Sequence, residues 1–227
     1  APENTLAAID QAVIDGADAI EIDVRLTADA HVMLYHDRTM ARLTGDPREF
    51  GDLTRDELSQ FDVGSWFGDT FQGEPIPGLD ETLRAVRGQA SLLIEMKPLP
   101  GQGRQLADAV IEVLFEESQQ RLVCWSQQAA PLRAYARCGF PNAFADMSAA
   151  TMTPSLLRYL NAQAPALRTT LLAQLILPGT LNRREFDALG LRHNRITEQE
   201  VRLALLYDYD IHAWTAKSRA RMSAVID

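Results

Sequence analysis

The stretch AIEIDVRLTADAHVMLYHD, residues 19–37, decides the fold of this chain. In its first part, AIEIDVRL (19–26), apolar residues alternate with charged ones at the two-residue period of a β-strand. A short polar turn and a second strand, HVMLYHD (31–37), follow it. Glu21 and Asp23 project from one face of the first strand, where two carboxylates repel each other unless a cation lies between them. The stretch therefore predicts paired strands that carry a charged site.

Helices and strands alternate on both sides of this stretch. We expect a helix over 2–16, which Gly16 ends, and a short helix over 53–61. Further strands are expected at 91–96, 121–125, 142–147 and 211–216. Further helices are expected at 79–86, 103–117, 127–139, 153–162, 197–209 and from 217 onward. The apolar runs within 165–195 fit a strand or a helix equally well.

This alternation favours an α/β fold with a parallel sheet and helices outside it. The pattern holds about seven candidate strands, and a closed barrel of eight βα units typically needs ~250 residues. We therefore predict a TIM (β/α)8 barrel that is truncated at both ends and forms a single domain over residues 1–227. Residues 38–78, rich in Gly, Pro and Asp, are expected to form a loop-rich insertion after the second strand. A doubly wound open sheet is the alternative, but the chain has no GxGxxG or GxxxxGKS motif to support a nucleotide-binding version.

The composition restricts the classes of partner. The formal net charge is -9 and the sequence pI is about 5.0, which disfavours non-specific binding to nucleic acid or to anionic membranes. The longest apolar run is shorter than the ~20 residues that a membrane-spanning helix needs, so we expect no transmembrane segment. The only cysteines are Cys124 and Cys138, so a disulfide framework is not expected. The low cysteine count leans towards a cytoplasmic protein, although a secreted one fits as well.

Polar residues gather where the predicted strands end, the position of active sites in α/β barrels. Glu21 and Asp23 lie late in the first strand, and His36 ends the second. The next strand ends in Glu95 and Lys97, again two residues apart and on one face. Trp214 closes the strand at 211–216. Three carboxylates around one point suit a hard divalent ion, Mg2+ or Ca2+. With a lysine for a phosphate oxygen and a histidine for proton transfer, the set suits cleavage of a phosphodiester.

Each of these features has a plainer interpretation when taken alone. Two acids on a strand are usually surface residues, and Glu95 with Lys97 resembles an ordinary ion pair. A lone tryptophan such as Trp214 more often packs in a core than lines a pocket. The functional interpretation depends on joint placement, because every one of these residues falls where a barrel would have its active site.

The same residues resemble the glycerophosphodiester phosphodiesterase family. The segment 1–37 is similar to the family's opening, in which HRG, PENT, ExD, TxDG and HD follow in order. The later segments DVGSWFGDTFQGEPIPGLDETL (62–83), IEMK (94–97) and HAWTAK (212–217) resemble its next blocks. The resemblance covers most of the chain, and it is weakest over residues 140–196.

The resemblance implies a βα barrel that hydrolyses glycerophosphodiesters to glycerol 3-phosphate and an alcohol by general acid/base catalysis. It implies roles for the residues as follows: Glu21, Asp23 and Glu95 as metal ligands, His36 as one of two catalytic histidines, Lys97 as the phosphate contact, Trp214 as a wall of the glycerol pocket, and Glu3 and Asn4 as supports of the site. The partner is then a small-molecule phosphodiester. Neither the resemblance nor the composition indicates the oligomeric state.

The chain departs from the family pattern in four places, one of which is the final strand that we expect after MSAVID (222–227). The HRG motif, with the other catalytic histidine, is expected just upstream of Ala1, so we expect a chain trimmed at that end. Ala30 stands where the family usually has glycine, and Ala216-Lys217 replaces a more common Val-Asn. Two rival functions stay open: a lysophospholipase D or sphingomyelinase D activity, favoured by an apolar groove near GSWFGDTF, and a non-catalytic barrel scaffold.

Overall fold

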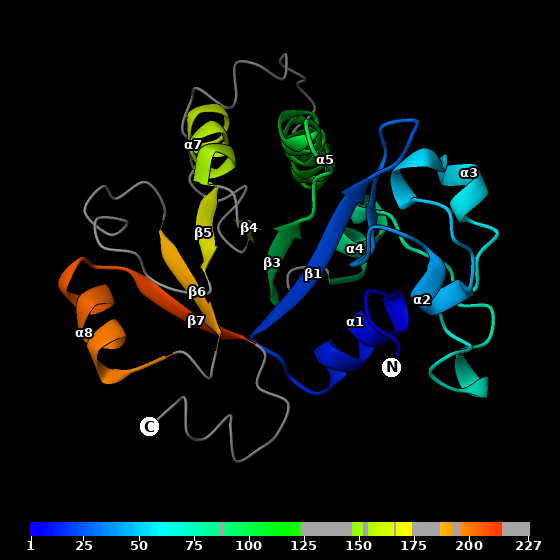
Figure 1. The fold of residues 1–227 in the computed structure, drawn as a ribbon, viewed down its shortest axis with the longest axis horizontal. Coiled ribbons are helices and arrows are strands. Elements are labelled where there is room, and N and C mark those ends of the chain that lie inside the picture. The colour runs from blue at the N-terminus through cyan, green and yellow to red at the C-terminus, as the bar shows by residue number, and fades with distance from the viewer. Residues whose placement is uncertain are drawn as a thin grey trace. The chain divides into compact units, whose positions relative to one another are not determined.

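The computed structural model describes residues 1–86, 89–123, 147–151, 154–165, 167–173, 187–192 and 196–214 (Figure 1). The chain divides into two compact units, Ala1–Met147 and Ser148–Asp227. The prediction of a single domain over 1–227 stays a prediction. No helix in the described ranges is both long enough and apolar enough to cross a membrane.

The first unit is built around β1 (Ala19–Leu26), which has a strand on each side. β3 (Ser91–Met96) pairs with it in parallel, and Asp23 lies directly beside Glu95. β2 (Val32–Leu34) pairs with it antiparallel, so β1 and β2 form a hairpin. The expected strands are therefore present, but β2 is not a parallel barrel strand. His36 lies beside β1 because the chain turns back after β1 and runs antiparallel to it. It does not lie at the end of a parallel strand.

The apolar faces of these strands form the core of the first unit. Ile22 and Val24 of β1 lie beside Ile94 and Met96 of β3, and all four side chains are buried. Three longer helices of the described residues pack one against the next in this unit. α1 (Leu6–Ile14) packs against α4 (Leu79–Val86), and α4 packs against α5 (Gly103–Val123). Because side chains alternate along a strand, the polar residues between these apolar ones, such as Asp23 and Glu95, lie on the opposite face of β1 and β3.

The insertion at 38–78 has short elements and a small core of its own. Its helical turns are α2 (Ala41–Thr44), η1 (Phe50–Asp52), α3 (Arg55–Leu58) and η2 (Asp69–Phe71). The ring of Phe50 stacks on Tyr35, just beyond β2, at a centroid distance of 5.2 Å. The core residues of this region are Met33, Tyr35, Met40, Phe50, Leu53, Leu58, Val63 and Ile76. The aromatic side chains of Trp66 and Phe67 are exposed instead.

One strand prediction in the first unit is wrong in part. The run at 121–125 was expected to be a strand, but α5 continues through Arg121 to Val123. A short apolar run carries no period that separates strand from helix, and here the preceding helix continues through it. Residues 124 and 125, and the helix expected at 127–139, lie outside the described residues.

Within its described residues, the second unit forms four parallel strands, the first of which begins at Met147, the last residue of the first unit. They are β4 (Met147–Thr151), β5 (Arg168–Ala173), β6 (Ala188–Arg192) and β7 (Asp210–Trp214), each paired with the next. The helix α7 (Pro154–Gln163) joins β4 to β5, and α8 (Glu198–Leu206) joins β6 to β7. The ambiguous region 165–195 thus supplies two strands. Of the strand expected at 142–147, Met147 is the first residue of β4, and residues 142–146 lie outside the described residues. The helix expected from 217 lies outside the described residues.

Candidate active site

Three carboxylates meet on the polar face of β1 and β3. Glu21 and Asp23 are two residues apart on β1, and Glu95 is the parallel-register neighbour of Asp23 on β3. One carboxylate oxygen from each lies within 4.8 Å of the others. The period of two along β1 and the register across to β3 are sufficient to bring them together. The structure therefore assembles the three acids that the sequence singled out.

Lys97 lies against this cluster, immediately after β3. Its Nζ is 3.3 Å from Oδ1 of Asp23 and also contacts Oε1 of Glu95. Burial disfavours the charge of Lys97, but the hydrogen bond to Glu95 and the nearby carboxylates outweigh it and raise its pKa above the usual value. Lys97 is therefore held as a cation within the carboxylate cluster.

One ammonium does not neutralise three carboxylates. Burial, together with the negative charges of Asp23 and Glu95, raises the pKa of Glu21 to about 8, while Lys97 opposes this shift. Glu21 nevertheless keeps solvent-exposed surface, and the repulsion from Asp23 and Glu95 disfavours its negative charge in addition to the burial. A group of closely spaced oxygen donors with excess negative charge fits a hard divalent cation. The residues present thus suit a metal ion.

Asp23 is held in place by Asn4. Nδ2 of Asn4 donates to Oδ2 of Asp23 at 2.9 Å, and the Asp23 backbone N–H donates to Oδ1 of Asn4, also at 2.9 Å. Asn4 has a φ of 55°, in the left-handed region that asparagine tolerates better than most residues. The structure thus places Asn4, expected to support the site, in direct contact with an acid of the cluster.

His36 belongs to a chain of hydrogen-bonded side chains at the end of the hairpin. Its Nδ1 lies 2.6 Å from Oδ1 of Asp37, and the other oxygen of Asp37 accepts from Nε of Arg42. The guanidinium of Arg42 also donates to both carboxylate oxygens of Glu3, one of them at 3.2 Å. Glu3 and Asp37 together raise the pKa of Arg42 far above its ordinary value. Glu3 is thus linked to His36 through Arg42 and Asp37.

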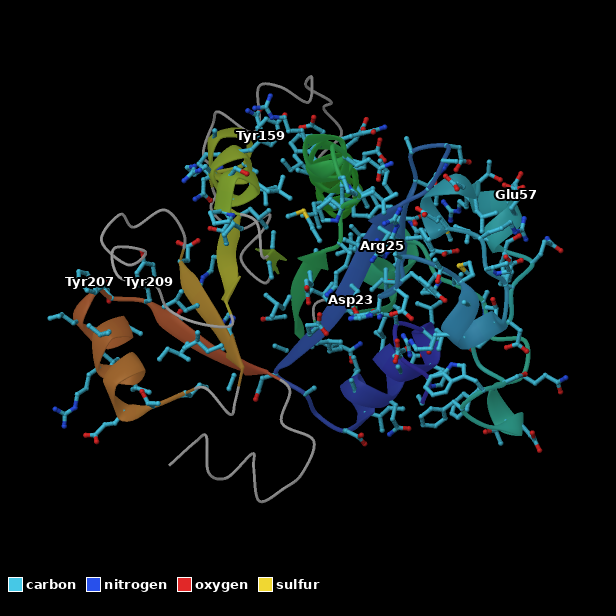
Figure 2. All side chains as sticks on the ribbon, viewed as in Figure 1. Asp23, Arg25, Glu57, Tyr159, Tyr207 and Tyr209 are labelled. Atoms are coloured by element: carbon cyan, nitrogen blue, oxygen red, sulfur yellow. The ribbon has the colours of Figure 1, made fainter. Side chains whose placement is uncertain are left out.

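Sequence reasoning missed two arginines of this region. Arg42 could have been suspected from its spacing, five residues after Asp37, but only the fold brings it against Glu3. Arg25 follows Glu21 and Asp23 on the same face of β1, and its guanidinium binds the carbonyl groups of His36 and Lys97. No sequence pattern indicates the contacts of Arg25, because its two partners are backbone carbonyl groups on other segments. Figure 2 shows Asp23 and Arg25 along β1.

Trp214 is the last residue of β7, where it lies beside Arg192 of β6. It belongs to the second unit, and its side chain is outside what the structure describes. Its predicted role in a glycerol pocket stays a prediction.

The whole chain, residues 1–227, matches the Glycerophosphoryl diester phosphodiesterase family. The chain belongs to this family. Within it, YhdW of Bacillus subtilis (strain 168) is 46% identical over 102 residues, which are 45% of this chain and 42% of that protein. A glycerophosphodiester phosphodiesterase of Caldanaerobacter subterraneus subsp. tengcongensis is 40% identical over 121 residues, 51% of this chain and 50% of that protein. The chain thus spans half or less of the length of these curated relatives.

Solved structures of glycerophosphodiester phosphodiesterases and related enzymes have the same fold. A phosphodiesterase of Oleispira antarctica, in complex with the product sn-glycerol-3-phosphate, is 24% identical with a TM-score of 0.83 and covers 100% of this chain and 84% of its own. The glycerophosphodiester phosphodiesterase of Agrobacterium tumefaciens is 23% identical with a TM-score of 0.74, over 100% of this chain and 87% of its own. The α/β fold of the TIM-barrel type that the sequence predicted is confirmed.

Proposed function

We propose that this protein hydrolyses glycerophosphodiesters to glycerol 3-phosphate and an alcohol. The observation that carries the proposal is the cluster of Glu21, Asp23 and Glu95 with Lys97 against it, in a chain of the glycerophosphoryl diester phosphodiesterase family. Carboxylate oxygens beside an ammonium suit a cation and a phosphate bound side by side. The complex of the Oleispira neighbour with sn-glycerol-3-phosphate supports the same substrate class.

Glu21, Asp23 and Glu95 would hold the divalent ion, which we take to be Mg2+ or Ca2+ because all three donors are carboxylate oxygens. When bound, such an ion supplies positive charge that polarises a phosphoryl oxygen and makes a nearby hydroxyl or water more acidic. Asn4 keeps the Asp23 carboxylate in its orientation through the hydrogen bond to Oδ2. Lys97, already held as a cation, donates to a phosphate oxygen.

His36 is the residue that we propose to transfer the proton. Because its Nδ1 is committed to Asp37, Nε2 is the atom left to accept a proton from an attacking hydroxyl or to give one to the leaving alcohol. Its side chain is half exposed, so a substrate has access to it. Asp37 orients the ring and favours the tautomer with its hydrogen on Nδ1.

The test is a hydrolysis assay of a water-soluble glycerophosphodiester on the natural full-length protein. The protein is stripped with a chelator and then supplied with Mg2+ or Ca2+, and glycerol 3-phosphate is measured. We expect activity to require the ion, and Asp23→Asn to lose both activity and calorimetric ion binding. Asp46→Asn is the matched control, because Asp46 pairs with Arg48 at 2.8 Å in the insertion, outside the cluster. Equal activity in Asp23→Asn would contradict the proposal.

A lysolipid substrate is assayed in parallel. The exposed rings of Trp66 and Phe67 give the insertion an apolar surface that an acyl chain could contact. Faster turnover of the lysolipid would favour the lysophospholipase D alternative. Saturable ion binding without turnover of either substrate would favour the scaffold.

A further inference from the structure

Arg25 reaches across both neighbours of β1. Its Nε and Nη2 both donate to the carbonyl oxygen of His36, at 3.2 and 2.8 Å, and its Nη1 donates to the carbonyl oxygen of Lys97 at 3.0 Å. His36 follows β2 and Lys97 follows β3, on opposite sides of β1. One guanidinium therefore joins the two segments that carry the proposed proton-transfer residue and the proposed phosphate contact.

The contacts of Arg25 begin where the backbone pairing ends. On one side, the Tyr35 N–H donates to the Asp23 carbonyl at 3.0 Å, and on the other the Lys97 N–H donates to the Val24 carbonyl at 3.0 Å. Among the described contacts, neither segment makes a further backbone hydrogen bond to β1 after these two. On the β2 side, Arg25 binds the carbonyl of His36, the residue after Tyr35. On the β3 side, it binds the carbonyl of Lys97 itself. The side chain of Arg25 thus adds one hydrogen-bonded contact beyond the last backbone bond on each side of β1.

The chemistry of arginine suits this task. Its planar fork presents donors in fixed directions, and charge-assisted hydrogen bonds to carbonyl oxygens are stronger than neutral ones. A lysine has the same charge but a single ammonium on a flexible stem, so it cannot hold two carbonyls in the same fixed geometry. Arg25 lies two residues from Asp23, whose negative charge acts on its guanidinium, but the described hydrogen bonds of that guanidinium go to the two carbonyl groups and not to the three acids.

We infer that Arg25 is a positioning residue, which fixes His36 and Lys97 relative to each other by binding both of their backbone carbonyls. The inference rests on the proposed function for the roles of these two residues. Because a misplacement of about 1 Å can cost up to ~100-fold in rate, loss of Arg25 should act on turnover more than on substrate or metal binding.

The experiment compares Arg25→Met, Arg25→Lys and the unchanged protein. Methionine keeps an apolar stem of similar width and removes every donor. We expect kcat to fall about tenfold or more in both variants, with KM and calorimetric ion affinity changed by less than about threefold. Arg202→Met is the control for loss of an exposed arginine, since Arg202 pairs only with Glu198 among its described contacts.

Amide hydrogen exchange provides a readout that does not depend on activity. We expect the Tyr35 and Lys97 amides to exchange faster in Arg25→Met than in the unchanged protein, because both pairings end one contact earlier. If the unchanged protein hydrolyses no glycerophosphodiester, the proposed function fails while the exchange rates still decide whether Arg25 holds the two segments.

Four results would overturn the inference. Unchanged exchange at both amides would show that Arg25 does not hold the segments. Full kcat in Arg25→Lys would show that charge alone matters. A rise in KM with kcat preserved would make Arg25 a substrate contact. A fall in ion affinity equal to the fall in kcat would place its effect on the carboxylate cluster.

Discussion

Asn4 and Asp23 are joined by two hydrogen bonds of 2.9 Å each, one to the carboxylate and one from the backbone N–H of Asp23. The pair connects the segment before α1 to the middle of β1, and it aligns Asp23 with its remaining oxygen towards Lys97. A residue that binds a metal ligand from behind commonly tunes the affinity of the ion. The PENT segment therefore contributes to the site without itself belonging to the carboxylate cluster.

Asn4→Gly tests this contribution. Glycine removes the side chain and accepts the φ of 55° without strain, so the variant isolates the loss of the hydrogen bonds. We expect the affinity for Mg2+ or Ca2+ to fall about tenfold, because the Asp23 carboxylate loses its orientation. Calorimetric titration measures it, and an affinity equal to that of the unchanged protein would contradict this role of Asn4.

Asp37→Asn tests the orientation of His36. The amide oxygen can still accept from Arg42, but the side chain then presents its NH2 group, in place of a carboxylate oxygen, to Nδ1 of His36. We expect kcat to fall about 10- to 100-fold with ion affinity preserved, since general acid/base catalysis contributes about 10²- to 10⁴-fold. Asp46→Asn serves as the matched control, because the Asp46 side chain is about as exposed as that of Asp37 and also pairs with an arginine. A comparable fall in that variant would show a non-specific effect.

Ala30→Gly is expected to stabilise the protein. Ala30 has a φ of 63° in the turn of the β1–β2 hairpin, where its Cβ is disfavoured by about 1–2 kcal/mol. Glycine removes that cost but adds unfolded-state entropy of about 0.4–1 kcal/mol, so we expect a net gain of roughly 0.5–1 kcal/mol. Urea unfolding measures it. In Ala12→Gly, within α1, the same replacement should destabilise by about 1 kcal/mol.

His212 is expected to make the second unit sensitive to acid. Burial lowers its pKa, Asp210 opposes this shift and Arg168 adds to it, and its Nδ1 is buried with no described partner. At a pH below about 6.5 the unfolded chain binds a proton there that the folded chain resists, so unfolding becomes easier as the pH falls.

Urea unfolding at a series of pH values measures this effect. We expect the free energy of unfolding to decrease as the pH falls from 6.5 towards the lowered pKa of His212, and His212→Gln to weaken that decrease. His31→Gln is the control, because His31 is exposed and lies 3.2 Å from Asp29 in the hairpin turn. An identical pH profile in His212→Gln and the unchanged protein would refute the prediction.

The sequence predicted the carboxylate cluster because its geometry is local and periodic. Two acids at i and i+2 on a strand share a face, and an acid late in the next parallel strand lies beside them, as Glu95 lies beside Asp23. Strands with strong alternation were placed correctly for the same reason. The run at 121–125 was not, because a short apolar run has no period of its own and α5 extends through Val123.

What the sequence could not predict depends on contacts between distant segments. The short polar turn after β1 indicates antiparallel pairing, yet His36 was assigned to the C-terminal end of a barrel strand, and β2 is not such a strand. The role of Arg25 depends on two carbonyl groups, 11 and 72 residues away along the chain. Every residue has a carbonyl, so side-chain identity gives no indication of which ones an arginine will bind.

The length of the turn between β1 and β2 sets the pairing register of the two strands and therefore the position of His36. Thr27 donates its backbone N–H to the His31 carbonyl at 3.0 Å, which closes the turn and aligns Val24 with Leu34. A shift of the returning strand by one residue would move it roughly 3.3 Å along β1 and exchange its two faces. An insertion or deletion between residues 27 and 31, although remote from the three acids, would thus move His36 away from its present position beside β1. We therefore expect the number of residues in this turn to determine where His36 lies relative to the three acids.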